Sequence, residues 1–391
     1  MAKLIGNAPN QISTNGDLGS MAFEDRTNYI TKNNPVHQPF RNIIINGDMS
    51  IAQRGTSATG LGNGDSGYHT VDRFKFVENN APTCEFTQTQ STDVPTGQGF
   101  ATSLKMDCTT AQGSLAGDDF IYINTSAEGQ NLQYLKKGTA NALSLTLSFW
   151  VKSNKTGTYI FEIIDRDNDR AISKSYTISS ASTWEKKTIT LDGDTTGTLD
   201  NDNARSFEII FWLLAGANFQ SGTLQTSWNT RTTANDAVGQ VNLADNTANE
   251  WFITGVQLEA GTTASDFEFL PYDVNLRRCY RYCYRINGNA VDDVLTGGAG
   301  PATTTSRIDT AIQFLVPMRA IPSVSEALLE VYPGSTAGSL GSIFDNDGTK
   351  DITTIGFQIN ADSGSPFTLN NFYLVRCDAN ASAFIEFDAE L

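Results

Sequence analysis

The segment Trp251–Tyr272 constrains the fold of this chain more than any other stretch, because it has the pattern of two strands joined by a turn. The first strand has two faces, with Phe252, Val256 and Leu258 on one and Gln257 and Glu259 on the other. Gly255 interrupts this strand and indicates a bulge or a close backbone approach. A second short strand would place Phe267 and Phe269 on one face, and Pro271 would end the pairing. We predict that these strands close a large β domain, which a connector and a smaller β domain follow.

The period of two that marks a half-buried strand recurs along the chain. Apolar and polar residues alternate over Leu143–Lys152, and Thr158–Ile164 and Ala171–Ile178 flank an Asp-rich turn, as in a hairpin. Phe207–Leu214 is almost continuously apolar, as expected of a central strand that is buried on both faces. Short strands with Gly and Asn turns favour a sandwich or barrel. The predicted core contains Leu145, Leu147, Phe149, Ile163, Ile210, Val256 and Leu258.

The predicted fold class is therefore all-β: a jelly-roll-like β-sandwich, a short connector helix and a smaller C-terminal β-sandwich, preceded by an extended N-terminal arm. The expected parts are the arm at 1–40, the jelly roll at 41–275, the connector at 276–289 and the C-terminal β domain at 290–391. The single predicted helix is Asp273–Ile286, where Cys279 and Cys283 would share a face. Its four arginines suit either a connector packed between domains or a receptor-contacting patch.

Composition excludes several classes of partner. The formal net charge of −16 argues against nucleic acid and anionic lipid, which lysine and arginine would have to hold. The five cysteines are an odd number at low density, which favours reduced thiols made in a cytoplasm. The N-terminus has no signal-peptide pattern. The longest apolar run, Ile209–Ala217, is too short to cross a bilayer, so no membrane insertion is expected.

No catalytic motif has its structural context. Gly64–Gly67 (GDSG) with His69 and Asp72 resembles a serine-protease nucleophile, but only 65 residues precede Ser66, and the other histidine lies in the N-terminal arm. A flexible loop is the better interpretation. Glycosidase chemistry needs two carboxylates that flank a cleft, and no spacing selects such a pair. We therefore expect no enzyme activity.

One acidic stretch resembles half of a calcium loop. Asp165, Asp167 and Asp169 alternate as calcium ligands do, but the glycine and the distal glutamate of such a loop are missing. The same residues suit a solvated hairpin turn, because Asp and Asn favour turns. Both interpretations stay open, and no other cofactor is expected.

Several motifs occur in the order found in bacteriophage tail-fibre and receptor-binding proteins. They are Asn42–Ser57, Tyr68–Phe74, Gly99–Lys105, the segment Trp251–Tyr272 with the following Cys279, Arg281 and Tyr282, and the ending Phe387–Leu391. The chain resembles this family well over about 42–285 and loosely elsewhere. The resemblance implies a virion protein made in the host cytoplasm, a homotrimer, and a jelly roll like that of carbohydrate-binding modules.

The same resemblance suggests where the chain would meet its partners. Residues 1–40, which include NGDLGSMAF, would attach it to a phage tail or capsid protein through Leu18, Met21 and Phe23; composition alone also allows a disordered tail. The candidate contacts to a host surface glycan are Trp228, Tyr332 and Phe344, aromatic side chains in loop-like stretches. The leading hypothesis is a non-catalytic tail fibre or adhesin. The alternatives are a structural appendage such as a head fibre, collar or decoration protein, and a surface-glycan hydrolase.

Overall fold

The computed structural model describes residues 40–80, 82–305, 308–332, 338–342, 356–360, 362–363, 367–378 and 380–391. The predicted attachment residues Leu18, Met21 and Phe23 and the predicted glycan contact Phe344 lie outside these ranges. The described residues from Asn42 onward belong to one compact unit, Asn42–Leu391.

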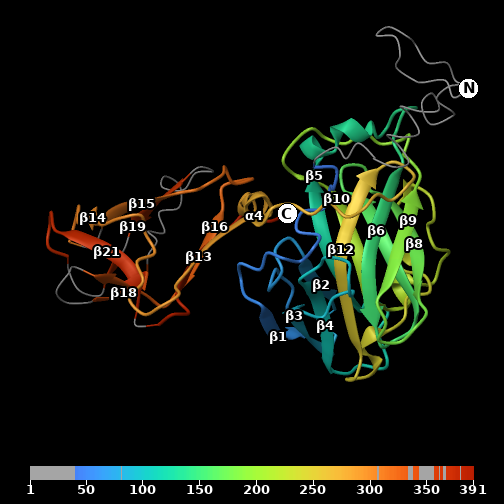
Figure 1. The fold of residues 1–391 in the computed structure, drawn as a ribbon, viewed down its shortest axis with the longest axis horizontal. Helices are drawn as coiled ribbons and strands as arrows, with labels where there is room; N and C mark the ends of the chain where they lie inside the picture. The colour runs from blue at the N-terminus through green and yellow to red at the C-terminus, as the bar shows by residue number, and fades with distance from the viewer. Residues whose placement is uncertain are drawn as a thin grey trace, which may run out of the picture. The chain divides into compact units, whose positions relative to one another are not determined.

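Residues 42–286 contain two six-stranded antiparallel sheets that face each other (Figure 1). Sheet A has the order β1 (Ser57–Gly62), β3 (Glu85–Ser91), β4 (Ser103–Thr110), β12 (Glu250–Ala260), β6 (Leu145–Ser153), β9 (Glu185–Leu191). Sheet B has the order β11 (Asn229–Thr230), β8 (Arg170–Ile178), β7 (Gly157–Asp165), β10 (Arg205–Ala215), β5 (Phe120–Glu128), β2 (Lys75–Asn79). The jelly-roll-like sandwich predicted for this region is confirmed.

The main core fills the space between the two sheets. It buries six of the seven predicted core residues, namely Leu145, Leu147, Phe149, Ile163, Val256 and Leu258. Ile210, the seventh, is fully buried but belongs to a second cluster with Trp212 and Ile160. That cluster lies on the opposite face of sheet B, because Ile209 and Phe211 of the same strand point into the main core. β10 is therefore buried on both faces, as its apolar sequence predicted.

The prediction for β12 was wrong in one respect, and the glycine explains it. The pairing of β12 with β6 shifts between Thr254 and Gln257, so a bulge lies at Gly255. The extra residue reverses the alternation: Trp251 and Ile253 point into the core before the bulge, and Val256 does so after it. Phe252 therefore points to the outer face of sheet A, opposite to its predicted side.

The second predicted strand of that segment is absent from the described structure, where 261–271 forms no helix or strand. Pro271 instead directly precedes the helix α4 (Tyr272–Tyr280). α4 ends earlier than expected, because Cys283–Asn287 forms the strand β13. Cys279 and Cys283 thus share no helix face, although both are buried. None of the helices in the described ranges combines the length and the apolar character that crossing a membrane requires.

The remaining described strands form three small antiparallel sheets. The first has the order β13, β22 (Phe384–Asp388), β16 (Ser323–Ala327). The second has the order β14 (Gly300–Pro301), β21 (Phe372–Cys377), β17 (Leu329–Tyr332), β18 (Gly338–Ser342), β20 (Asp362–Ser363). The third pairs β15 (Asp309–Gln313) with β19 (Gly356–Asn360). Their shared core includes Ile308, Val331, Val375, Ile385 and Phe387.

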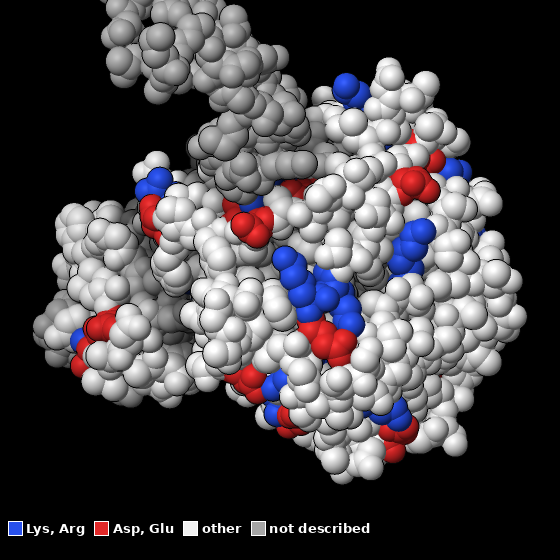
Figure 2. All heavy atoms as spheres, turned by 45° about the vertical axis from the view of Figure 1, so that its right-hand side comes forward, with Lys and Arg blue, Asp and Glu red and all other residues white. Residues whose placement is uncertain are grey.

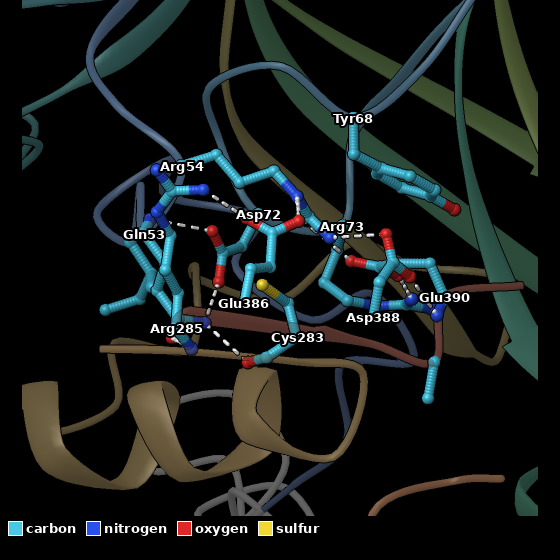
Figure 3. A network of polar contacts seen from close by, with 12 residues as sticks. Gln53, Arg54, Tyr68, Asp72, Arg73, Cys283, Arg285, Glu386, Asp388 and Glu390 are labelled. Carbon is cyan, nitrogen blue, oxygen red and sulfur yellow. Dashed lines mark hydrogen bonds and ion pairs between the residues drawn. The ribbon is translucent and has the colours of Figure 1, made fainter. Parts of the chain in front are cut away.

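Two arginines, Arg54 before β1 and Arg73 between β1 and β2, bind carboxylates of residues 386–390 (Figure 3). Nε of Arg54 lies 3.0 Å from Oε1 of Glu386, and its Nη2 lies 3.0 Å from Oδ2 of Asp388. Arg73 is fully buried and pairs with Glu390. Since both arginines come from 42–80 and the carboxylates from 386–390, this network ties β22 to the jelly roll.

The predicted basic spot on the connector is used inside the protein. Arg281 makes a two-pronged ion pair with Glu128 of β5, at 2.7 Å for both bonds. Arg285 pairs with Glu386 at 2.5 Å. These contacts support the packing interpretation of the connector over that of a receptor-contacting patch.

Candidate functional site

The two outer faces of the sandwich differ. Residues 217–240 cover the outer face of sheet B, where Phe219, Leu224 and Ala237 join the aromatic cluster around Trp212. The outer face of sheet A instead carries polar and aromatic side chains in cross-strand rows. In one row Thr254 of β12 pairs with Trp150 of β6, which pairs with Lys186 of β9. Side chains that are paired in this way stand about 5 Å apart.

A pocket of about 300 Å³ opens on this row. Its lining consists of Gly97, Gln98, Phe100, Ser148, Trp150, Lys186, Gly255, Asp266, Phe267 and Phe269. Trp150 is half-buried, and its indole N–H has no hydrogen-bond partner in the described part of the chain. The side chain of Phe269 is 50% exposed. The pocket therefore combines aromatic surfaces with amide, hydroxyl and ammonium groups.

The bulge in β12 shapes one side of this pocket. Gly255 has a φ of 63°, and a Cβ atom on it would lie 2.5 Å from Cζ of Phe100. The missing side chain thus lets the ring of Phe100 rest on the sheet. Phe267 and Phe269 each pack against that ring, with centroids 5.1 Å apart in both contacts. The glycine therefore allows the rings of Phe100, Phe267 and Phe269, which we call the aromatic wall, to pack against the sheet.

Two outward side chains of β12 hold the segment that carries this wall. Gln257 accepts a hydrogen bond from the backbone N–H of Glu268 at 2.8 Å and donates one to the carbonyl of Asp266 at 3.2 Å. Glu259 accepts hydrogen bonds from the N–H and the hydroxyl of Ser265, at 2.8 and 2.7 Å. The bonds are local and buried or half-buried, so the wall is fixed to a rigid sheet rather than left as a free loop.

A second row on the same face alternates cations and aromatic rings. Nζ of Lys152 lies 4.1 Å from the ring centroid of Phe252 and 5.6 Å from that of Trp184. Nζ of Lys105 lies 5.4 Å from the same Phe252 ring and 2.9 Å from Glu250. In the view of Figure 2, positive and negative side chains lie beside each other in small groups on a mostly uncharged surface.

Trp228, a predicted glycan contact, is held inside its own domain. Its indole N–H donates to the carbonyl of Asp192 at 2.9 Å. Its ring stacks on Phe207 at 5.9 Å, and Nζ of Lys137 lies 5.3 Å from the ring centroid. The side chain is half-buried and packs against the main core. Phe207 therefore covers one face of the Trp228 ring.

Tyr332, the other described candidate, lies at the end of β17, and the guanidinium carbon of Arg376 is 3.7 Å from its ring centroid. The structure brings neither Tyr332 nor Trp228 to the pocket lining. Trp150 was not among the residues that the sequence singled out as candidate glycan contacts. The signal that could have found it is the alternation over Leu143–Lys152, where Trp150 falls on the polar face.

The predicted calcium-binding residues form a turn between β7 and β8. The carboxylate of Asp165 is fully buried and accepts hydrogen bonds from the N–H groups of Asp167 and Asn168 at 3.0 and 3.2 Å. Its other oxygen accepts from Nζ of Lys137 at 2.5 Å. Among the described residues, no three His, Cys, Asp or Glu side chains are grouped as metal ligands. The arrangement matches the hairpin-turn interpretation.

The GDSG stretch forms no catalytic triad. The hydroxyl of Ser66 accepts a hydrogen bond from the N–H of Glu78 at 3.0 Å, and His69 faces Asp65 at 3.9 Å. Asp72 accepts two bonds from Gln53 instead of orienting a histidine. Burial raises the pKa of Asp72 to about 6, although the bonds from Gln53 lower it. These contacts support the interpretation as a loop over that of a protease nucleophile, although the loop is held by hydrogen bonds rather than left flexible.

No protein-family model matches the sequence. No curated protein matches it either. Similar solved structures include the enzymatically active domain of bacteriophage CBA120 tailspike protein 4, with a TM-score of 0.30 and 14% identity over 57% of this chain and 22% of that chain. The family 11 carbohydrate-binding module of the Clostridium thermocellum cellulase Lic26A-Cel5E has a TM-score of 0.27 and 13% identity over 53% of this chain and 97% of the module. TmCBM61, solved with β-1,4-galactotriose, has a TM-score of 0.27 and 10% identity over 56% and 99%. The likeness assigns no residue of this chain a role.

Proposed function

We propose that this chain is a non-catalytic glycan-binding protein of a bacteriophage virion, a tail fibre or adhesin that attaches the particle to a host surface glycan. The observation that carries the glycan-binding part is the pocket around Trp150. Sugar-binding sites pair aromatic faces with polar groups, because a sugar ring has apolar C–H faces and hydroxyl edges. The virion part rests on the motifs shared with phage tail-fibre and receptor-binding proteins.

The make-up of the pocket favours binding over hydrolysis. Glycosidases need two carboxylic groups on either side of the bond that they break. Asp266 is the one carboxylate among the residues that line the pocket in the described structure. A single stacking contact contributes only about 1 kcal/mol, so affinity per pocket should be weak. A homotrimer carrying three such pockets could raise avidity by about 10²–10⁴.

The site proposed here lies in the jelly roll and not in the 290–391 domain. The arm at 1–40 stays a proposed attachment segment for a phage tail or capsid protein, and its residues lie outside the described structure. A structural appendage without receptor binding, such as a head fibre or collar protein, is the competing function. Labelling the protein on intact particles distinguishes the two locations.

The test of glycan binding is the variant Trp150→Ala, measured on a glycan array and by adsorption of the full chain to host cells. Loss of most binding is expected, because the pocket loses its flat aromatic surface. The matched control is Tyr272→Ala, since Tyr272 is an aromatic residue of α4 that is 63% exposed and is not part of the lining. Unfolding curves confirm that both variants fold. Undiminished binding by Trp150→Ala would refute the proposed site.

A further inference from the structure

The pocket contains a positive charge that the chain itself does not neutralise. Lys186 is exposed on β9, directly opposite Trp150 of β6, and lines the same pocket. In the described part of the chain its ammonium group has neither an ion pair nor a hydrogen bond. We propose that the ligand of this pocket is a carboxylate-bearing sugar whose anionic group pairs with Lys186 while its ring lies on Trp150. This inference rests on the proposed glycan-binding function.

The neighbouring lysines of sheet A make Lys186 stand out. Lys105 pairs with Glu250 at 2.9 Å, and Lys187 pairs with Glu185 at 2.5 Å. Lys152 pairs with Asp93. Each of these charges therefore already has an anionic partner within the protein. Lys186 is the described lysine of this face whose anionic partner has to come from elsewhere.

Asp266, the other charged side chain of the pocket, is not the anionic partner of Lys186. Asp266 lines the pocket too, but it has an interaction within the chain that does not involve Lys186. The remaining polar groups, the amide of Gln98 and the hydroxyl of Ser148, are neutral. A ligand carboxylate that pairs with Lys186 would thus leave two neutral groups of the lining, the amide of Gln98 and the hydroxyl of Ser148, to bind sugar hydroxyls.

The negative net charge of the chain makes a short-range contact with Lys186 important for an anionic ligand. A protein with a formal net charge of −16 repels an anionic polysaccharide at long range. Binding of such a ligand therefore depends on a contact that acts at short range, where an ammonium group can donate hydrogen bonds to a carboxylate. The flexible stem of lysine suits this, because it can place three donors over the edge of a ring that is stacked on the neighbouring strand.

The test uses paired ligands that differ only in charge. Oligosaccharides of hexuronic acids and of sialic acid are immobilised on an array beside their methyl esters, which keep the shape of the sugar and remove the negative charge. The full chain is compared with Lys186→Gln. The control is Lys174→Gln, because Lys174 lies on β8 of sheet B and likewise has no partner in the described residues.

The wild-type chain is expected to prefer acids over esters, and Lys186→Gln should lose about 2- to 5-fold in affinity for the acids while binding esters unchanged. Lys174→Gln should behave as the wild type. Equal binding of acids and esters, with no effect of Lys186→Gln, would overturn the inference but leave the proposed function standing. If Trp150→Ala also leaves all binding unchanged, the proposed site itself fails.

Discussion

Gly255 and Phe100 fit together so closely that a single Cβ atom on the glycine would lie 2.5 Å from Cζ of the ring. The contact connects two motifs that are far apart in the sequence, and it sets the position of the aromatic wall beside Trp150. A residue that looked like an interruption of a strand is therefore part of the candidate site.

This contact predicts the outcome of Gly255→Ala. The variant should lose about 1–3 kcal/mol in free energy of unfolding, because the added methyl group overlaps the ring and the positive φ disfavours alanine. Gly60→Ala is the matched control: Gly60 has a similar φ of 71°, but a Cβ there would meet nothing within 4 Å. Urea unfolding measures both. Equal losses in the two variants would show that the overlap with Phe100 has no cost.

The ion pair between Arg73 and Glu390 should be a major contributor to the stability of the unit. Arg73 is 1% exposed and Glu390 has a side-chain exposure of 4%, so Glu390→Gln leaves a buried charge without its partner. A loss of about 3–5 kcal/mol in free energy of unfolding is expected. Asp388→Asn should cost less than about 1 kcal/mol, because Asp388 is 36% exposed. Similar losses in free energy of unfolding for the two variants would contradict a major contribution from the buried ion pair between Arg73 and Glu390.

The carboxyl group of Glu162 should make stability depend on pH. Burial, and then the neighbouring Asp236, raise the pKa of Glu162 well above its ordinary value of 4.5. The folded chain thus holds a proton that the unfolded chain releases, so this group lowers stability as the pH rises above about 4.5. Glu162→Gln keeps an acceptor for the indole N–H of Trp212, 3.0 Å away. Its gain in Tm over the wild type should grow between about pH 5 and pH 8.

Glu128 provides a control of opposite sign for that experiment. Burial alone would raise the pKa of Glu128, but hydrogen bonds from Arg281 and Tyr282 bring it below its ordinary value of 4.5. Its contribution to stability is therefore present above about pH 4.5 and is lost as the pH falls through the lowered pKa. Glu128→Gln should lower Tm at neutral pH, and the deficit should shrink on acidification. The same pH trend in both variants would contradict the assignment of either group.

Calcium should leave the turn at Asp165 unaffected. The carboxylate already accepts bonds from Lys137 and from two backbone N–H groups of the turn. We expect equal Tm values with added calcium and with a chelator, whereas Asp165→Asn should cost about 1–3 kcal/mol, because the buried Lys137 loses one of its two ion pairs and keeps the one with Asp194 at 3.0 Å. An increase in Tm on addition of calcium that Asp165→Asn abolishes would show a site after all.

The sequence by itself indicated the strands β6, β7, β8, β10 and β12 of the sandwich and part of its core. Leu145, Leu147 and Phe149 could be assigned because alternation with a period of two is a local property, which follows from strand geometry. The double burial of β10 was readable for the same reason. The local signal misled at Phe252, because a one-residue bulge reverses every side chain that follows it.

Only the tertiary structure decided where the site lies and how the C-terminal residues are held against the jelly roll. Alternation puts Trp150 on the polar face of its strand, but only the tertiary structure shows that this face carries a pocket. The last four residues of the predicted helix, 283–286, belong instead to the strand β13, because it pairs with β22, about 100 residues further along the chain. Arg73 and Glu390 are 317 positions apart, and Gly255 and Phe100 come from different strands and loops. Such contacts depend on which segments the fold brings together, and no local pattern in a sequence encodes that.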